Sequence, residues 1–192
     1  MEFYYLDTTN AIYCAMLLPI LAMAGNMAFS GSKDIRDIFT LICAILTFSC
    51  VLMILSNVGN GVTQATSLLN IFPGVDIAFS VEPLGLLFAI IASGLWILTH
   101  IYGVGYMRGN NEKHHARFFA CFCIAISSVI GIAFASNMFT LFLFYEILTV
   151  STYPLVAHKG TKESIRGARL YLSILIGTSI VLQLTAIIWT YV

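Results

Sequence analysis

Six long runs of apolar residues, separated by short polar stretches, make up most of the chain. Each run holds about twenty residues, the length of an α-helix that crosses the hydrocarbon layer of a membrane. Only helices and closed barrels satisfy backbone hydrogen bonds in lipid, and these runs are too long and continuous for barrel strands. The pattern predicts an all-α polytopic membrane protein with one transmembrane domain over 1–192 and helices at about 11–29, 38–56, 84–105, 117–135, 138–157 and 169–190.

The connection between the second and third runs has a different pattern. It is polar and rich in glycine and asparagine up to Pro73-Gly74, and then Val75, Ile77 and Phe79 alternate with polar or small residues. Alternation with a period of two is typical of a β-strand. We expect a short β-hairpin outside the membrane, between helices 2 and 3; an extended linker is the alternative.

The basic residues indicate how the helices are oriented. An alternating six-helix arrangement places every one of them on the same side of the membrane, and by the positive-inside rule that side is cytoplasmic. The N- and C-termini and the expected hairpin then face outside. The nine residues are Lys33, Arg36, Arg108, Lys113, Arg117, Lys159, Lys162, Arg166 and Arg169.

The composition excludes several classes of protein. Only 9% of the residues are charged and 59% are hydrophobic, whereas soluble domains contain about 25% charged residues. The formal charge is zero, and the basic residues are too scattered for a surface that follows a phosphate backbone, so no nucleic-acid partner is expected. We expect the chain to be surrounded by a lipid bilayer.

No motif for covalent chemistry is evident. The five cysteines lie in apolar runs, and Cys121-x-Cys123 has no second pair nearby, which favours packing residues over a metal site. There is no glycine-rich phosphate loop and no nucleophile motif. We therefore expect no cofactor, no bound metal and no catalytic residue, and we interpret the chain as a transporter subunit rather than an enzyme.

Glu146 is the main candidate for function. It is a lone carboxylate about eight residues into the fifth predicted helix, or roughly 12 Å from its start and near the middle of the membrane. A charged residue at that depth costs about 2.5–3.5 kcal/mol on insertion scales, and such residues are usually functional. The side chain must be protonated or paired with a cation. We interpret Glu146 as a proton-transfer residue; a structural, hydrogen-bonding glutamate is the alternative.

Two polar residues lie on the same helical stripe as Glu146. Thr149 and Tyr153 follow it at i+3 and i+7, towards the cytoplasmic end, and are expected to order water. Pro154 removes the hydrogen bond to the carbonyl of Val150, which suggests a kinked and hydrated half-helix. The alternative is a proline that only bends the end of a packed helix.

Other polar residues fall near the same depth in neighbouring helices. His100 is a weaker candidate for proton transfer, because it lies nearer the cytoplasmic end of its predicted helix, roughly 10 Å from the depth of Glu146. A packing histidine is the alternative. No basic residue lies at the depth of Glu146. The polar residues expected to line a path are Ser127, Ser128, Thr178, Ser179 and Gln183.

Four segments resemble the antiporter-like subunit family: "SVEPLGLLFAIIASGLWILTHIYGVGYMRG" (80–109), "RFFACF" (117–122), "NMFTLFLFYEILTVSTYPLV" (137–156) and "TKESIRGARLYL" (161–172). The family includes the D and A subunits of Mrp-type multisubunit cation/proton antiporters. It also includes the homologous proton-pumping membrane subunits of respiratory complex I and of membrane-bound hydrogenases. The segments look most similar to the Mrp-type D subunit. Glu82 stands where the family usually has Asp before Pro-Leu-Gly.

The resemblance implies a role for Glu146 and a larger protein. In the family, the glutamate of the fifth helix pairs with a lysine of the seventh, and Glu146 matches that glutamate. Family members have about fourteen helices, so a chain that ends after its sixth is expected to be an N-terminal portion without the lysine.

The implied function is proton translocation coupled to Na⁺ or another monovalent cation. The expected partners are other subunits of the antiporter, in the inner (cell) membrane of a bacterium. Two alternatives remain: a proton-pumping subunit of a complex I-like NADH:quinone oxidoreductase or hydrogenase, and a structural or assembly subunit that transports nothing.

Overall fold

A row of membrane-length helices makes up the computed structural model, which describes residues 2–29, 31–59, 65–72, 75–110, 112 and 114–191. Six helices among the described residues are long and apolar enough to cross a membrane, which confirms the predicted fold class. The elements are α1 (Glu2–Ala28), α2 (Lys33–Gly59), β1 (Ala65–Phe72), β2 (Val75–Ser80), α3 (Pro83–Gly109), α4 (His115–Ala133), α5 (Met138–Val156), α6 (Lys162–Thr178), the π-helical segment η1 (Ser179–Leu184) and α7 (Thr185–Tyr191). The last three form one continuous span.

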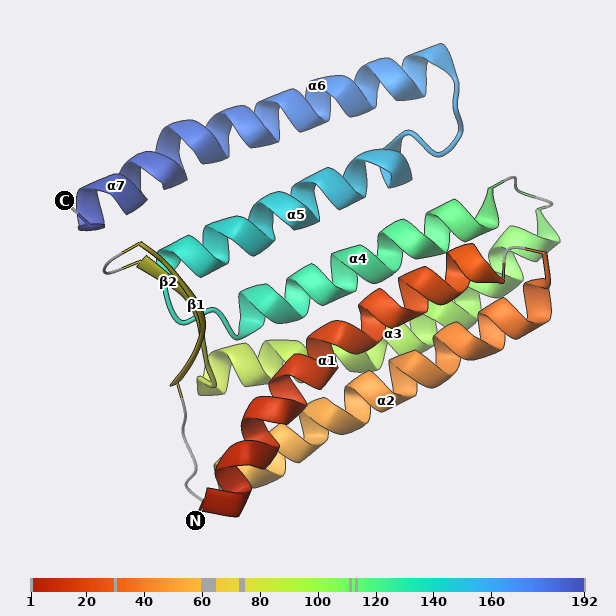
Figure 1. Ribbon diagram of the computed structural model, residues 1–192. Helices are drawn as coiled ribbons and strands as arrows, with labels where there is room; N and C mark the ends of the chain where they lie inside the picture. Colours follow the sequence, from red (N-terminus) through yellow and green to blue (C-terminus); the bar gives the residue numbers. More distant parts are fainter. Residues whose placement is uncertain are drawn as a thin grey trace.

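The helices α1 to α4 form a bundle, and α5 and the last span extend it sideways. In the bundle α1 packs on α2 and α4, and α3 packs on α2 and α4. Then α5 lies against α4, and α6 lies against α5 at the edge of the molecule (Figure 1). Both termini and the hairpin lie at one end of the helices, and the three connections with basic residues lie at the other (Figure 1). Lys113 falls outside the described residues.

The predicted hairpin is confirmed. Strands β1 and β2 pair antiparallel, with Ala65 opposite Ser80. The hairpin is tied to the turn between α4 and α5: the amide of Ser80 donates to the carbonyl of Phe134 (2.8 Å), and the amide of Ser136 donates to that of Ala78 (2.9 Å). These bonds satisfy backbone groups that would otherwise be unpaired at a buried turn, and they fix where α5 begins.

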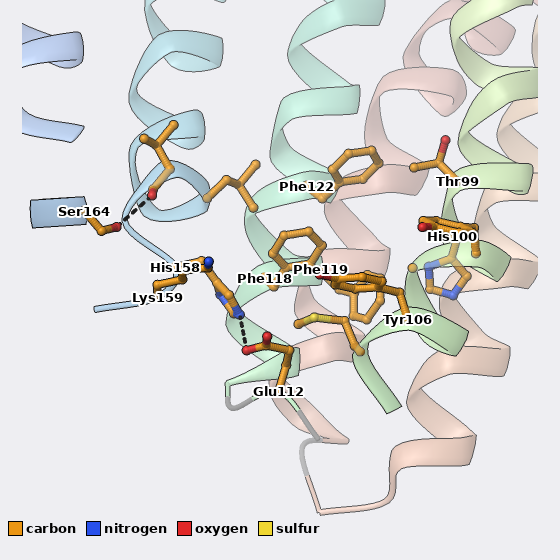
Figure 2. Close-up of a pocket in the computed structure, with 15 residues that line it drawn as sticks. Thr99, His100, Tyr106, Glu112, Phe118, Phe119, Phe122, His158, Lys159 and Ser164 are labelled. Atoms are coloured by element: carbon orange, nitrogen blue, oxygen red, sulfur yellow. Dashed lines mark hydrogen bonds and ion pairs between the residues drawn. The ribbon is translucent and has the colours of Figure 1, made fainter. Parts of the chain in front are cut away.

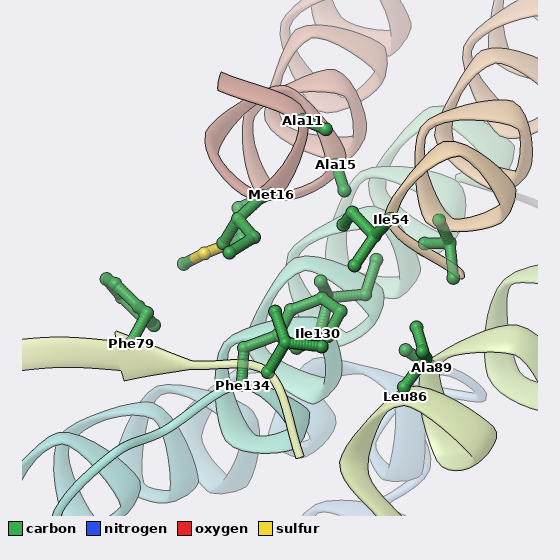
Figure 3. Close-up of a cluster of buried hydrophobic side chains, with 12 residues drawn as sticks. Ala11, Ala15, Met16, Ile54, Phe79, Leu86, Ala89, Ile130 and Phe134 are labelled. Carbon is green, nitrogen blue, oxygen red and sulfur yellow. The ribbon is translucent and has the colours of Figure 1, made fainter. Parts of the chain in front are cut away.

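The hydrophobic core lies where the hairpin meets the bundle. Phe79 of β2 is 1% exposed and points into a cluster formed by α1, α2, α3 and α4 (Figure 3). Phe134, at the end of α4, is fully buried beside it. Gly85 allows α3 to approach α4 closely, because a Cβ there would collide with the carbonyl of Ala133. Close packing at this end fixes the position of α4, and of α5 next to it, relative to the other helices of the bundle.

Several helices extend beyond the apolar runs. The second begins at Lys33 rather than near residue 38, the third ends at Gly109 rather than near 105, and the last begins at Lys162 rather than near 169. The last helix starts with a cap: the hydroxyl of Thr161 accepts a hydrogen bond from the amide of Ser164. A hydropathy pattern indicates which residues contact lipid and not where a helix begins or ends. The polar turns at the ends of these helices were therefore not predicted.

Candidate functional site

Glu146 lies on α5 where this helix faces the last span. Its side chain is half-buried, and the hydroxyl of Ser179 donates a hydrogen bond to its Oε1. The structure thus brings together two of the predicted residues, from helices 33 positions apart in the sequence.

The helix that carries Ser179 changes its geometry at this residue. The π-helical segment η1 begins at Ser179 and ends at Leu184, between two α-helical stretches. Wider turns of this kind are rare and are frequent at functional sites. Ser179 is buried, while Ile180 and Val181 on the same turn are exposed. Sequence reasoning missed this change, because π-helical turns have no residue pattern comparable to a cap or a proline.

A cavity of about 350 Å³ adjoins Glu146 on the side of α4. Ile124 of α4 and Leu143, Ile147, Val150 and Ser151 of α5 form the rest of its lining. The lining is mostly apolar, and Ile147 and Val150 are 40% and 54% exposed, so the cavity is open at the surface of the two helices. Glu146 therefore has a hydroxyl partner on one side and open space on the other.

The predicted stripe from Glu146 towards the cytoplasmic end is only partly in place. Thr149 is 4% exposed and Tyr153 is half-buried. Helix α5 continues through Pro154 to Val156. The hydroxyls of Ser151 and Thr152 bond the carbonyls of Leu148 and Thr149, each at 2.8 Å, so they do not satisfy the carbonyl of Val150.

The other predicted lining residues do not converge on Glu146. Ser127 donates to the carbonyl of Met16 on α1 (2.8 Å), which joins two helices of the bundle. Ser128 and Thr178 bond carbonyls of their own helices, at Ile124 and at Ile174, both at 2.9 Å. Gln183 is half-buried in η1. The direction in which a helical side chain points depends on the helices packed around it, and the depth of the residue in its predicted span does not give that direction.

His100 faces α2 and not α5. It is 3% exposed, its Nε2 lies 3.0 Å from the carbonyl oxygen of Asp37, and its ring makes an edge contact with Phe119. Because that oxygen only accepts, Nε2 must carry the proton of this bond. His100 contacts Phe119 near the cytoplasmic start of α4 and lines the same cavity as Leu155 and Val156 at the end of α5, so it lies nearer that end than Glu146 does, in agreement with the depth difference expected from the sequence. The two side chains also face different helices.

A buried ionic cluster beside His100 was missed by the sequence reasoning. Arg36 and Asp37 are 2% and 7% exposed, and Arg36 Nη2 lies 2.7 Å from Asp37 Oδ1. Arg108 of α3 bridges two carboxylates: its Nη2 lies 2.6 Å from Asp37 Oδ2 and its Nη1 2.8 Å from Asp34 Oδ1. Two cations and two carboxylates balance, as buried charges require. The sequence placed Arg36 in a connection because α2 was expected to begin later.

None of these cations reaches Glu146. Among the residues described here, no Lys, Arg or His side chain forms an ion pair with Glu146; the ion pairs involve Asp34, Asp37 and Glu112. The same set of described residues contains no group of three or more His, Cys, Asp and Glu that could hold a metal ion. The site therefore consists of a carboxylate, a hydroxyl donor and a cavity.

Comparison with known proteins identifies relatives of the chain. Residues 73–119 match the family described as NADH-ubiquinone oxidoreductase (complex I), chain 5 N-terminus. The chain is 27% identical over 165 residues to the A1 subunit of a Na⁺/H⁺ antiporter of Staphylococcus aureus (strain bovine RF122 / ET3-1), a match that covers 83% of this chain and 20% of the relative. It is 21% identical over 174 residues to NAD(P)H-quinone oxidoreductase subunit 5, chloroplastic, of Chara vulgaris, over 86% of this chain and 26% of the relative.

The fold is also similar to a solved structure. A chain of the membrane-bound sulfane sulfur reductase, an archaeal respiratory membrane complex, matches with a TM-score of 0.68 and 15% sequence identity. The match covers 90% of this chain and 28% of that chain. The chain thus spans about a fifth to a quarter of the length of these relatives, and over most of its own length it is homologous to the antiporter A1 subunit and to quinone oxidoreductase subunit 5.

Proposed function

We propose that this chain, homologous over most of its length to the A1 subunit of Na⁺/H⁺ antiporters and to subunit 5 of complex I-like oxidoreductases, forms part of a membrane protein that translocates protons in exchange for Na⁺. The exchange would take place in a multisubunit Mrp-type antiporter of a bacterial cell membrane. The similarity to the A1 subunit supports the antiporter family; the closer likeness to the D subunit remains a prediction from the sequence.

The observation that carries the proposal is the contact between Glu146 and Ser179 in the middle of two spanning helices. A carboxylate at this depth is costly and is seldom kept without a function. Here it has a hydroxyl donor and an adjacent cavity, and none of the described Lys, Arg and His side chains forms an ion pair with it. That environment suits a group that is charged in one step and neutral in the next.

The mechanism follows from this arrangement. The hydroxyl of Ser179 donates to the carboxylate when Glu146 has released its proton, and water that reaches the open cavity in the assembled protein would carry the proton to or from it. Thr149 and Tyr153 continue the polar stripe towards the cytoplasmic end and would order that water. His100 is the weaker relay candidate, because its Nε2 proton is committed to the carbonyl of Asp37. A cation from a partner protein or another segment would set the proton affinity of Glu146.

A transport assay on the assembled complex tests the proposal. Inverted membrane vesicles are loaded with Na⁺, and the pH change that follows the imposed gradient is measured by a fluorescent amine. Glu146→Gln should reduce it to background, because an amide cannot exchange a proton. Ser179→Ala should slow it without abolishing it, since a hydrogen bond to a charged group contributes about 1.5–3 kcal/mol.

The control is Glu163→Gln, which changes an exposed carboxylate at the start of α6. It should leave transport unchanged. If the Glu146→Gln complex assembles in normal amount and still transports at the rate of the unchanged protein, Glu146 is a structural residue and the proposal fails.

A second candidate is a proton-pumping subunit of a complex I-like oxidoreductase or hydrogenase. The family match over residues 73–119 favours it, because its description names complex I. The same vesicles separate the two candidates: Na⁺-driven proton movement supports the antiporter, whereas proton movement that requires an electron donor and is insensitive to Na⁺ supports the redox complex.

A further inference from the structure

A second cavity, of about 430 Å³, lies at the end of the helices that carries the basic connections. Its walls come from α3, α4 and α5 (Figure 2). Phe118 and Phe122 of α4 form the floor, with Tyr102 and Tyr106 of α3 on one side and Val156 of α5 on the other. This volume falls in the range of small-molecule sites, about 300–1,000 Å³, and such sites are mostly apolar and aromatic.

The cavity is open to lipid along its sides. Tyr102, Tyr106 and Val156 are 72%, 52% and 47% exposed, and Tyr102 and Tyr106 stack at a centroid distance of 6.1 Å. The lining extends along α3 from Thr99 to Met107, or roughly 12 Å along the helix. It therefore covers a little less than half of a hydrocarbon layer of ~30 Å, which falls within the depth of one leaflet.

Glu112 and Lys159 line the mouth of the cavity, and Arg117 lies close enough to His158 for its charge to lower the pKa of that residue. Glu112 lies on the connection between α3 and α4, and Lys159 lies on the connection between α5 and α6. His158 is next to both, with its Nε2 4.0 Å from Oε2 of Glu112 (Figure 2). Burial lowers the pKa of His158, and the nearby charge of Glu112 opposes this effect only in part. His158 is therefore a weak ion-pair partner for Glu112 at neutral pH, which leaves the carboxylate of Glu112 open to another partner.

We propose that this cavity binds one phospholipid of the cytoplasmic leaflet whose headgroup carries both a phosphate and a primary amine, such as phosphatidylethanolamine. One acyl chain packs on Phe118, Phe122 and the tyrosines. The phosphate lies at Lys159, and the ammonium donates hydrogen bonds to Glu112. The paired charges at the mouth select this headgroup, because an anionic lipid would place its net charge against Glu112 and a choline headgroup has no N–H to donate.

Native mass spectrometry of the assembled membrane protein tests the proposal. The protein is placed in nanodiscs with equal amounts of phosphatidylethanolamine, phosphatidylcholine and phosphatidylglycerol, and the lipids retained per chain are counted after release into mild detergent. One phosphatidylethanolamine should be retained in preference to the other two. Lys159→Ala should lower this occupancy about fivefold, since one lysine near a membrane surface contributes about 1 kcal/mol.

Three further variants sharpen the test. Lys162→Ala, an exposed lysine that does not line the cavity, is the matched control and should retain the lipid. Phe122→Trp adds bulk to the wall on which the acyl chain packs and should reduce the occupancy of the lipid. Glu112→Gln should remove the preference for phosphatidylethanolamine over phosphatidylcholine, because an amide does not pair with the ammonium.

Two results would overturn the proposal. Equal retention of the three lipids, or retention that neither Lys159→Ala nor Phe122→Trp reduces, would show nonspecific lipid contact. A photoreactive residue in place of Tyr106 that cross-links to protein rather than to lipid would show that another segment or another protein fills the cavity.

Discussion

The bundle of α1 to α4 and the pair formed by α5 and the last span are packed differently, although all six spans are apolar enough to cross a membrane. In α4, half of the residues in an apolar stretch of 18 are buried, whereas only 11% are buried in the corresponding stretch of the last span. In the bundle, some buried polar groups bond across helices: Asn26 donates to Thr40 (2.9 Å), and Asn57 donates to Thr8 (3.0 Å). Other buried atoms there, such as Trp96 Nε1 and His100 Nδ1, have no hydrogen-bond partner among the described residues. In the other region Glu146 has one serine and a cavity.

The comparison distinguishes polar residues that stabilise the packing of the helices from Glu146, whose carboxylate is available for proton exchange. Arg36, Asp37 and Arg108 satisfy one another, so their charges stabilise helix packing and are not available for exchange. Glu146 accepts a hydrogen bond from Ser179 in a region where few residues are buried. A proton, water or a cation of a partner can therefore bind to its carboxylate. Substitutions in either region, or where the two regions meet, test this contrast.

Removal of the central carboxylate of the bundle should have the largest effect on stability. Asp37→Ala leaves Arg36 buried without its partner, which should cost about 3–5 kcal/mol. Asp34→Ala removes a carboxylate that is 80% exposed in its side chain and should cost about 1 kcal/mol or less. Thermal unfolding of the assembled protein in nanodiscs measures both. Similar losses for the two variants would mean that burial does not set the strength of this cluster.

Two glycines compare the packing where the two regions meet with the packing at the outer edge of the second region. A Cβ on Gly131 of α4 would collide with the ring of Phe144, so Gly131→Ala should destabilise the protein by about 1–3 kcal/mol. A Cβ on Gly177 of α6 would meet no atom within 4 Å, so Gly177→Ala should be neutral or should stabilise the helix by up to about 1 kcal/mol. The same unfolding measurement applies. A loss at Gly177 as large as that at Gly131 would show that a partner covers α6 in the assembled protein.

The smallest expected effect concerns pH and the place where the two regions meet. His158 follows α5, and its ring packs edge-on against Phe118 of α4. Its pKa is lowered, mainly by burial, from the ordinary value of 6.5. The unfolded chain then binds more protons at this position than the folded one, so stability should fall as the pH drops through 6.5 and level off below the folded pKa.

His158→Gln should remove this component of the pH dependence while other titrations continue. The measurement is the unfolding temperature of both proteins between about pH 8 and pH 5. A pH profile that is identical in the two proteins would show that His158 is not buried against α4 in the membrane.

Much of the fold was predictable because simple physical requirements act on the sequence. The need to satisfy the backbone in lipid makes each long apolar run a helix, and the alternation from Val75 to Phe79 marks a strand of the hairpin. Glu146 was recognised as a candidate because a carboxylate inside an apolar run is rare. The partner of Glu146 was harder to predict: five polar residues were named, and among the hydrogen bonds of the described residues Glu146 is joined to one of them, Ser179.

The sequence by itself determined six spans, a hairpin, the placement of the basic residues at one end and a carboxylate near mid-membrane. Only the tertiary structure decided which residues meet: Arg36 with Asp37 and Arg108, His100 with the carbonyl of Asp37, and Glu146 with Ser179 at a π-helical turn. The physical reason is that lipid is as apolar as a protein interior. The lipid-facing and buried sides of these helices therefore carry similar residues, and only packing shows which side is which.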